Sequence, residues 1–151
     1  MKEYIKADEV TASTIVDGWL HTGDIGYLDE DGYLFITGRV KDLINRGGEK
    51  ITAADVEMVL DSHPYVDESA VIGVPDPEWG ETVKAVVVLA SSADGLEHEV
   101  IRADLQDHCK SHLASYKTPA YIAFVDELTR NPMGKVLKTD LRRDHGAPDN
   151  D

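Results

Sequence analysis

Residues 69–90 read SAVIGVPDPEWGETVKAVVVLA, two runs rich in β-branched residues with a turn-rich segment between them. The runs at 69–74 and 82–90 have the length of strands, and Val and Ile pack well on a pleated surface. The intervening residues 75–80 contain two prolines and a glycine, which favour a turn. We therefore expect two central strands of one sheet.

The segments on both sides of these strands predict helices. Residues 52–62 begin with a Thr52–Asp55 capping box, carry apolar residues at helical spacing and end at a His-Pro pair. Residues 97–113 place an apolar side chain at every fourth position, at Ile101, Leu105, Cys109 and Leu113. Each helix therefore has one stripe suited to covering a sheet.

Further elements precede and follow this centre. Residues 121–125 predict a third strand, and the basic residues 135–143 predict a short terminal helix. Residues 25–36 (IGYLDEDGYLFI) alternate around Gly32 as in a β-hairpin, and residues 38–51 predict a second small hairpin around a Gly-Gly pair. The order favours an α+β fold, a small three-stranded sheet flanked by helices and preceded by a β-hairpin leader.

The composition excludes several classes of protein. The formal charge is −14, from 15 Lys and Arg against 29 Asp and Glu, so we expect no nucleic-acid partner. The single Cys109 cannot form an internal disulfide, and no basic segment with an apolar run opens the chain, which favours a cytoplasmic protein. His108 and His112 lie one helical turn apart without a third ligand at a convincing spacing, so we expect no metal site.

Three short strings point to the chemistry when they are taken together. They are GWLHTGD at 18–24, GRVKD at 38–42 and NPMGKVLK at 131–138. In this order and with these separations they resemble the C-terminal motifs of AMP-forming acyl-CoA synthetases and related adenylate-forming enzymes, over nearly the whole chain. The resemblance implies a remnant of a larger N-terminal domain at residues 1–40 and a mobile C-terminal lid at residues 41–145. The polar residues 146–151 predict a disordered tail.

The resemblance implies that Asp24 and Arg39 contact the nucleotide. Asp24 matches an acid that accepts hydrogen bonds from the ribose hydroxyls of ATP, which suits an acceptor-only carboxylate. Arg39 matches an arginine whose planar fork also contacts the ribose, and Lys50 occupies a place where some relatives have Arg near the phosphates. The structural alternatives are a turn cap for Asp24 and a solvated arginine at a strand end for Arg39.

The resemblance also assigns roles in lid movement and CoA binding. Lys41 matches the hinge about which the lid rotates, although a surface lysine would look the same in sequence. Gly47 and Gly48 match the glycines of a loop that lines the pantetheine tunnel of CoA, where a missing Cβ lets a thin ligand approach the backbone. A glycine turn joining two strands is compatible with the same residues.

Lys135 is the expected catalytic residue. The resemblance implies that its ammonium reaches both the substrate carboxylate and the α-phosphate of ATP. Two anions must meet there, and one ammonium between them at roughly 4 Å is worth on the order of 4 kcal/mol at an effective dielectric of about 20. Its removal would cost roughly 10²- to 10³-fold in rate. The structural alternative is a solvated lysine after a β-turn.

The activity implied for the whole enzyme is that of an AMP-forming acid–CoA ligase. A carboxylic acid and ATP form an acyl-adenylate and pyrophosphate, CoA then displaces AMP, and Mg²⁺ is bound mainly outside this chain. The strings KDLI at 41–44 and GGEKI at 47–51 look closer to ligases of fatty or aryl acids than to amino-acid adenylation modules. The family's phosphate loop and acyl pocket have no counterpart here, so the chain alone should be inactive without its N-terminal adenylation domain.

Two alternatives of other classes stay open. The chain could be a free-standing docking or regulatory lid module that acts with a separate adenylation domain, or the lid of a carrier-protein or luciferase-like relative. The apolar residues of the leader lack the partner surface that the larger enzyme would supply. This favours association, and we expect a homodimer by exchange of the leader between two copies.

Overall fold

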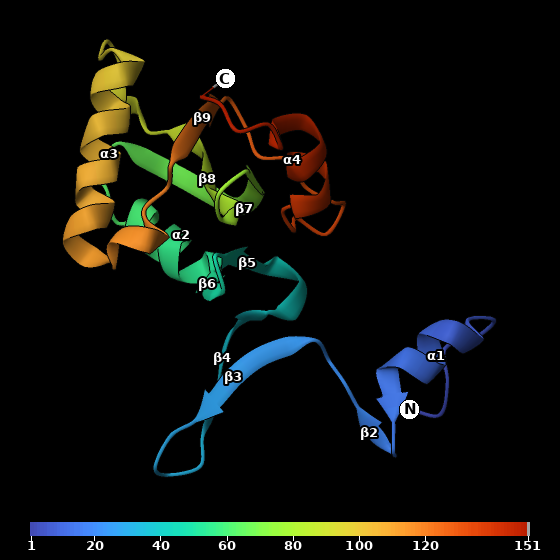
Figure 1. Cartoon of the computed structure of the whole chain (residues 1–151). Coiled ribbons are helices and arrows are strands. Elements are labelled where there is room, and N and C mark those ends of the chain that lie inside the picture. Colours follow the sequence, from blue (N-terminus) through green and yellow to red (C-terminus); the bar gives the residue numbers. More distant parts are fainter. Residues whose placement is uncertain (151) are drawn as a thin grey trace. The chain divides into compact units, whose positions relative to one another are not determined.

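The structure is a computed structural model that describes residues 1–150. The chain forms two compact units, Met1–Lys41 and a second unit that begins at Asp42. Figure 1 labels the helices and most of the strands of both units. Within residues 1–150, no helix combines the length and the apolar character needed to cross a membrane.

The second unit is built on a five-stranded sheet (Figure 1). Its long antiparallel pair is β7 (Val66–Asp76) and β8 (Gly80–Leu89), which form the two expected central strands. β9 (Tyr121–Val125) runs parallel to β8. β5 (Leu43–Arg46) and β6 (Glu49–Thr52) form an antiparallel hairpin.

The predicted α+β class is confirmed, and the sheet is larger than the three strands expected. Arg46 of β5 pairs with Gly80 at the start of β8, which adds the second small hairpin to the sheet. Because β7 occupies one edge of β8 along its length, β5 and β9 follow each other along the other edge. The sequence of a short hairpin does not show which sheet the hairpin joins, so its pairing with β8 was not predicted.

Helices cover both faces of this sheet (Figure 1). α2 (Ala53–Asp61) and α3 (His98–His112) pack on one face, where the predicted stripe Ile101, Leu105 and Cys109 is buried. α4 (Lys138–His145) buries Leu141 against the opposite face. Alternation along β7 sends neighbouring side chains to two separate cores. The first core includes Val56, Leu60, Val71, Val83 and Ile122, and the second includes Ile72, Val74, Val86 and Leu128.

The predicted capping box at the start of α2 is wrong. Thr52 holds the N-cap position but makes no side-chain capping hydrogen bond. The Asp55 carboxylate instead pairs with the Lys117 ammonium at 2.8 Å, across 62 positions of sequence. A tertiary ion pair therefore uses the carboxylate that a local cap would have required.

The first unit contains α1 (Asp8–Thr14), β1 (Ile15–Val16) paired with β2 (Trp19–Leu20), and the predicted hairpin of β3 (Asp24–Leu28) and β4 (Leu34–Arg39). The hairpin loop is closed by the Asp29 carboxylate, which accepts the N–H groups of Asp31 and Tyr33. None of residues 1–41 is buried. Most of the large exposed hydrophobic side chains lie here, among them Trp19, Leu20, Tyr27, Leu28, Tyr33, Leu34 and Ile36.

The sequence predicts a disordered tail at residues 146–151; residue 151 lies outside the described residues, and residues 147–150 make contacts with the second unit. The fully buried Lys84 side chain donates from Nζ to the Ala147 carbonyl at 3.0 Å and to the Asp149 carboxylate at 2.9 Å. The Asn150 side-chain oxygen accepts the Ile122 N–H at the free edge of β9, at 2.9 Å. A buried ammonium requires acceptors, and the tail supplies them.

Candidate functional site

Asp24 and Arg39, the two predicted ribose contacts, lie directly opposite each other on β3 and β4. The Arg39 Nε lies 3.0 Å from the Asp24 carboxylate, and both side chains remain partly exposed. The Thr22 hydroxyl accepts the Asp24 N–H at 3.2 Å, which fixes the main chain before the acid. The hairpin register therefore presents an acceptor and a multi-donor fork side by side.

A pocket of about 280 Å³ adjoins this ion pair and is lined by Thr22, Gly23, Arg39, Val40 and Lys41. The Val40 N–H donates to the Gly23 carbonyl at 2.9 Å, which holds the pocket's two segments together. Lys41, the predicted hinge, lies in the 3-10 turn Val40–Asp42, at the last residue of the first unit. The cationic donors Arg39 and Lys41, with the acceptor Asp24 beside Arg39, suit a ligand that carries hydroxyl and anionic groups.

Gly47 and Gly48 form the turn between β5 and β6, and both have positive φ, 59° and 98°. A Cβ on Gly47 would lie 2.6 Å from the Trp79 ring, and the Gly47 N–H donates to the Trp79 carbonyl at 2.8 Å. The Arg46 guanidinium stacks over the same ring, 4.9 Å from its centroid. A Cβ on Gly48 would meet open space, so one side of this loop is accessible to a thin ligand.

The loop at 131–135 presents Lys135 on a fixed main chain. The Asn131 side-chain oxygen accepts the N–H groups of Met133 and Lys135, at 3.0 and 2.9 Å. The Asn131 N–H donates to the Lys135 carbonyl at 2.9 Å, and Gly134 supplies a φ of 82°. This turn is tight, and Gly134 adopts a positive φ that a residue without a Cβ tolerates at little cost.

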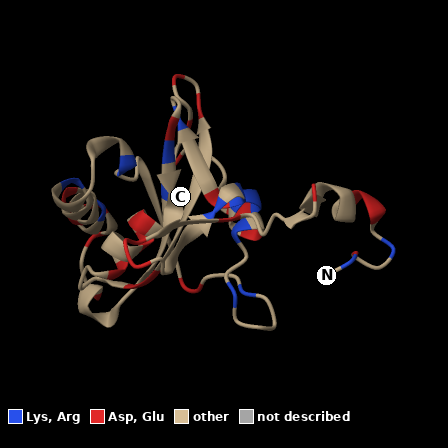
Figure 2. Cartoon of the chain, turned by 90° about the horizontal axis from the view of Figure 1, so that it is seen from below, with Lys and Arg blue, Asp and Glu red and all other residues tan. Residues whose placement is uncertain are grey.

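The Lys135 side chain differs from its basic neighbours. It is exposed, and its ammonium has no ion-pair or hydrogen-bond partner among residues 1–150. Every other Lys or Arg between 130 and 143 is paired with a carboxylate: Arg130 with Glu68, Lys138 with Glu57, Arg142 with Asp42, and Arg143 with Asp140 and Asp144. Figure 2 shows such basic and acidic residues beside one another on the second unit. Lys135 is therefore left available to an anion from outside the chain.

Lys50 is likewise exposed on β6 and has no ion pair among the described residues. The hairpin of β5 and β6 thus groups Lys50 with Gly47 and Gly48, while the hairpin of β3 and β4 groups Asp24 with Arg39. Within the described part of the second unit, no hydrogen bond or ion pair joins the Lys135 side chain to the hairpin of β5 and β6. The predicted site residues therefore form local groups, each on its own hairpin or loop.

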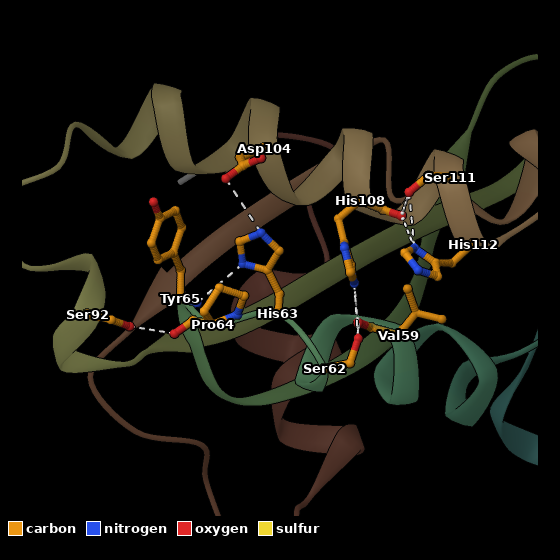
Figure 3. A network of polar contacts seen from close by, with 10 residues as sticks. All are labelled: Val59, Ser62, His63, Pro64, Tyr65, Ser92, Asp104, His108, Ser111 and His112. Atoms are coloured by element: carbon orange, nitrogen blue, oxygen red, sulfur yellow. Dashed lines mark hydrogen bonds and ion pairs between the residues drawn. The ribbon is translucent and has the colours of Figure 1, made fainter.

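Of the two histidines that the sequence analysis weighed as metal ligands, His108 links two helices and His112 bonds within its own helix (Figure 3). His108 Nε2 lies 3.1 Å from the Val59 carbonyl and 3.0 Å from the Ser62 hydroxyl, which link α3 to the end of α2. His112 Nδ1 lies 2.9 Å from the His108 carbonyl. No group of three or more His, Cys, Asp or Glu side chains within residues 1–150 is arranged to hold a metal ion.

Sequence reasoning missed Arg130, which contacts the lysine loop directly. One guanidinium nitrogen donates to the Gly134 carbonyl at 2.7 Å, and another pairs with the Glu68 carboxylate on β7. The partners Arg130 and Glu68 are 62 positions apart. A single sequence contains no signal for a pair at that distance, although Arg130 does stand directly before the NPMGK string.

Comparison with known proteins establishes the family. The model of the AMP-binding enzyme C-terminal domain matches residues 55–135, more than half of the chain. The chain belongs to this family, which confirms the resemblance inferred from the three strings.

Relatives of known name match nearly the whole chain. A fatty acid–[acyl-carrier-protein] ligase of Streptomyces coeruleorubidus is 47% identical over 142 residues, 94% of this chain and 26% of that protein. A long-chain-fatty-acid–CoA ligase of Mycobacterium tuberculosis is 44% identical over 147 residues, 97% of this chain and 28% of that protein. The chain therefore spans little more than a quarter of the length of these relatives.

A solved structure agrees with this result. The o-succinylbenzoate CoA synthetase of Bacillus subtilis, in complex with the acyl-adenylate intermediate, matches with a TM-score of 0.83 and 41% identity. The match covers 94% of this chain and 28% of that one. Both units therefore occur as a small part of a larger protein in this neighbour.

Proposed function

We propose that the chain is the C-terminal domain of an AMP-forming acid–CoA ligase, which joins a fatty or aryl acid to CoA through an acyl-adenylate. The observation that carries the proposal is Lys135: an exposed ammonium without a partner among the described residues, on a fixed loop whose neighbouring cations are all paired. Residues 1–40 are then a remnant of the adenylation domain, and residues 41–145 form the mobile lid. The whole enzyme acts in the cytoplasm.

In the first half-reaction a carboxylate oxygen of the acid attacks the α-phosphorus of ATP, and pyrophosphate leaves with the electrons of the broken P–O bond. The attack brings two anions together, and the cost of their repulsion rises in a site that excludes water. Lys135 lies between the carboxylate and the phosphate and lowers this cost. When bound, Mg²⁺ would neutralise further phosphate charge, and the residues that would hold it are assigned mainly to the adenylation domain.

Asp24 and Arg39 hold the ribose of the nucleotide in this proposal. Their side chains lie 3.0 Å apart, so a vicinal diol can accept from the guanidinium and donate to the carboxylate at the same time. Lys50 assists at the phosphates. The Bacillus subtilis neighbour, which contains an acyl-adenylate in a related protein, supports a nucleotide role for this region.

In the second half-reaction the thiol sulfur of CoA attacks the acyl carbon, the bond from that carbon to the phosphate oxygen breaks, and AMP leaves with its electrons while the thiol proton is released to solvent. The lid turns about Lys41, so that Lys135 departs and the loop at Gly47 and Gly48 lines the channel of the pantetheine arm. The open face of Gly48 supports this role, because no described side chain blocks it. One relative is named as a ligase that acts on an acyl-carrier protein. Both CoA and a carrier protein that bears a free thiol should therefore be tested as acceptors.

The decisive experiment compares the two half-reactions in the complete synthetase. Lys135→Ala should slow acid-dependent pyrophosphate exchange roughly 10²- to 10³-fold, as loss of one electrostatic stabiliser does. Formation of the thioester from supplied acyl-adenylate should continue. Lys110→Ala, which removes another exposed lysine of the same unit, is the matched control. Equal loss in both half-reactions, or no loss, overturns the proposal.

A free-standing docking module is the second candidate, favoured by the exposed apolar leader. Such a chain would bind a separately produced adenylation domain, or a second copy by exchange of the leader. Light scattering of the purified chain distinguishes these possibilities. A concentration-dependent dimer that the Trp19→Ser and Leu34→Ser double variant abolishes supports exchange, whereas a monomer at all concentrations contradicts it.

A further inference from the structure

We propose that Arg130 is a positioning residue for adenylation: it clamps the peptide group between Gly134 and Lys135 to β7 and so fixes the direction in which the Lys135 side chain leaves the loop. This inference rests on the proposed function of Lys135. It assigns a role to a side chain that does not itself contact the nucleotide or the acid.

The peptide group that precedes Lys135 is held at both of its ends. The Gly134 carbonyl accepts a hydrogen bond from the Arg130 guanidinium at 2.7 Å. The Lys135 N–H donates to the Asn131 side-chain oxygen at 2.9 Å. A peptide group is planar, so two such contacts fix its rotation. The Cα–Cβ direction of Lys135 then follows from the backbone.

The other end of Arg130 is anchored on the sheet. A second guanidinium nitrogen pairs with Glu68 on β7, a strand whose residues 70–72 are buried. The main chain of Arg130 also forms an isolated antiparallel bridge with Val136, which closes the base of the loop. The clamp thus transmits the position of a rigid strand to the loop through one planar side chain.

The clamp is needed because of Gly134. This residue adopts a φ of 82°, and a glycine can leave that conformation at little cost. Without the guanidinium, the Asn131 hydrogen bonds alone would hold this peptide group, and small rotations about the Gly134 bonds would change the direction of the long Lys135 side chain. An ammonium displaced by about 1 Å from its two anions loses much of its catalytic effect.

Arg130 differs in this respect from the other ion pairs near the loop. Lys138 pairs with Glu57 of α2, and Arg142 pairs with Asp42, so these contacts anchor α4 and the chain start of the second unit. The Arg130 side chain, by contrast, donates to the main chain of the loop that carries Lys135. A guanidinium can bridge two acceptors in fixed geometry, which an ammonium cannot reproduce.

The first test measures the clamp in the chain itself. Arg130→Gln should speed hydrogen exchange of the Lys135 amide roughly tenfold, as loss of one charge-assisted hydrogen bond would. The amides of β7 should exchange as in the wild type, and an unchanged thermal midpoint would show that the variant folds. Arg143→Gln is the matched control, because that exposed guanidinium pairs with Asp140 and Asp144 instead. An unchanged Lys135 amide overturns the clamp.

The second test measures the two half-reactions in the complete synthetase. Arg130→Gln should lower kcat for adenylation about tenfold without changing KM for ATP or the acid, since binding does not use the clamp. Thioester formation from supplied acyl-adenylate should be unaffected. Arg130→Lys should not restore kcat, and Glu68→Gln should add little to Arg130→Gln. A rise in KM, or equal loss in both half-reactions, contradicts a positioning role.

The failures of the two ideas are distinguishable. If Lys135→Ala leaves adenylation unchanged, the proposed function fails, and the catalytic role of Arg130 fails with it. If Lys135→Ala slows adenylation but Arg130→Gln does not, only the positioning role is overturned. The exchange measurement does not depend on catalysis, so it tests the geometry in either case.

Discussion

Residues 1–41 and residues 42–150 differ in how far they bury their apolar side chains. The second unit contains two packed cores on the faces of one sheet, and its helices close both. The first unit has regular strands and a closed hairpin but no buried residue, and Trp19 remains 76% exposed. Hydrogen bonding can thus form a hairpin, but burial of apolar area is needed to stabilise it independently. The first unit therefore lacks the buried apolar area that stabilises the second.

The largest expected effect is the difference in stability loss between a substitution of a buried leucine in the second unit and one of an exposed leucine in the first. Leu105→Ala removes a fully buried side chain of α3 and should destabilise the second unit by about 2–5 kcal/mol. Leu34→Ala, at a position that is 63% exposed on β4, should change stability by less than about 0.5 kcal/mol. Urea unfolding followed by circular dichroism measures both. Similar losses of stability in the two variants would show that buried apolar area does not distinguish the two units.

A smaller effect should show that the tail belongs to the second unit. Ending the chain at Gly146 removes the Ala147 carbonyl and the Asp149 carboxylate that accept from the buried Lys84 ammonium. Loss of acceptors from a buried polar group costs about 1–3 kcal/mol. In a Lys84→Met background the truncation should cost much less, because no ammonium remains to be satisfied. Equal truncation costs in both backgrounds would show that Lys84 is not what holds the tail.

Periodicity and turn residues predicted most of the second unit. The run at 82–90 is rich in β-branched residues because β8 is covered on both faces, and the spacing of Ile101, Leu105 and Cys109 reflects one buried stripe. The same run conceals Lys84, since a lysine within an apolar strand gives no sign of whether its ammonium reaches solvent or a tail. The contact of the tail with Lys84 joins residues 63 positions apart, which local sequence patterns do not predict.

The candidate site was predictable to a similar extent. The three strings led us to propose Asp24, Arg39 and Lys135 as site residues, and the hairpin register explains why the first two form a pair at 3.0 Å. The capping interpretation of Asp55 was wrong because Lys117, distant in sequence, competes for the carboxylate. Arg130 was missed for the same reason, since its partner Glu68 lies on β7. Local patterns predict elements, whereas long-range ion pairs require the fold.

The smallest expected effect is a loss of stability of the second unit at low pH. His63 is 7% exposed at the end of α2, and its Nδ1 accepts the Tyr65 N–H at 3.2 Å, so this nitrogen is unprotonated (Figure 3). Burial lowers the pKa of His63, the neighbouring His108 adds to this, and Asp104, 3.5 Å from Nε2, opposes it. A new proton on Nδ1 would also displace the Tyr65 N–H. The folded unit therefore resists a proton that the unfolded chain accepts.

The sign of the pH dependence follows from this lowered pKa. Stability from His63 is fully present above the ordinary histidine value of about 6.5 and is lost as the pH falls below it toward the folded pKa. The urea midpoint of unfolding should therefore decrease as the pH is lowered from about 7.5 to about 5.5. His63→Gln should reduce part of this dependence of the midpoint on pH. His21→Gln, an exposed position of the first unit, should leave the slope unchanged. If His21→Gln flattens it as much, the acid response does not depend on burial, and the contrast between the two units does not extend to titration.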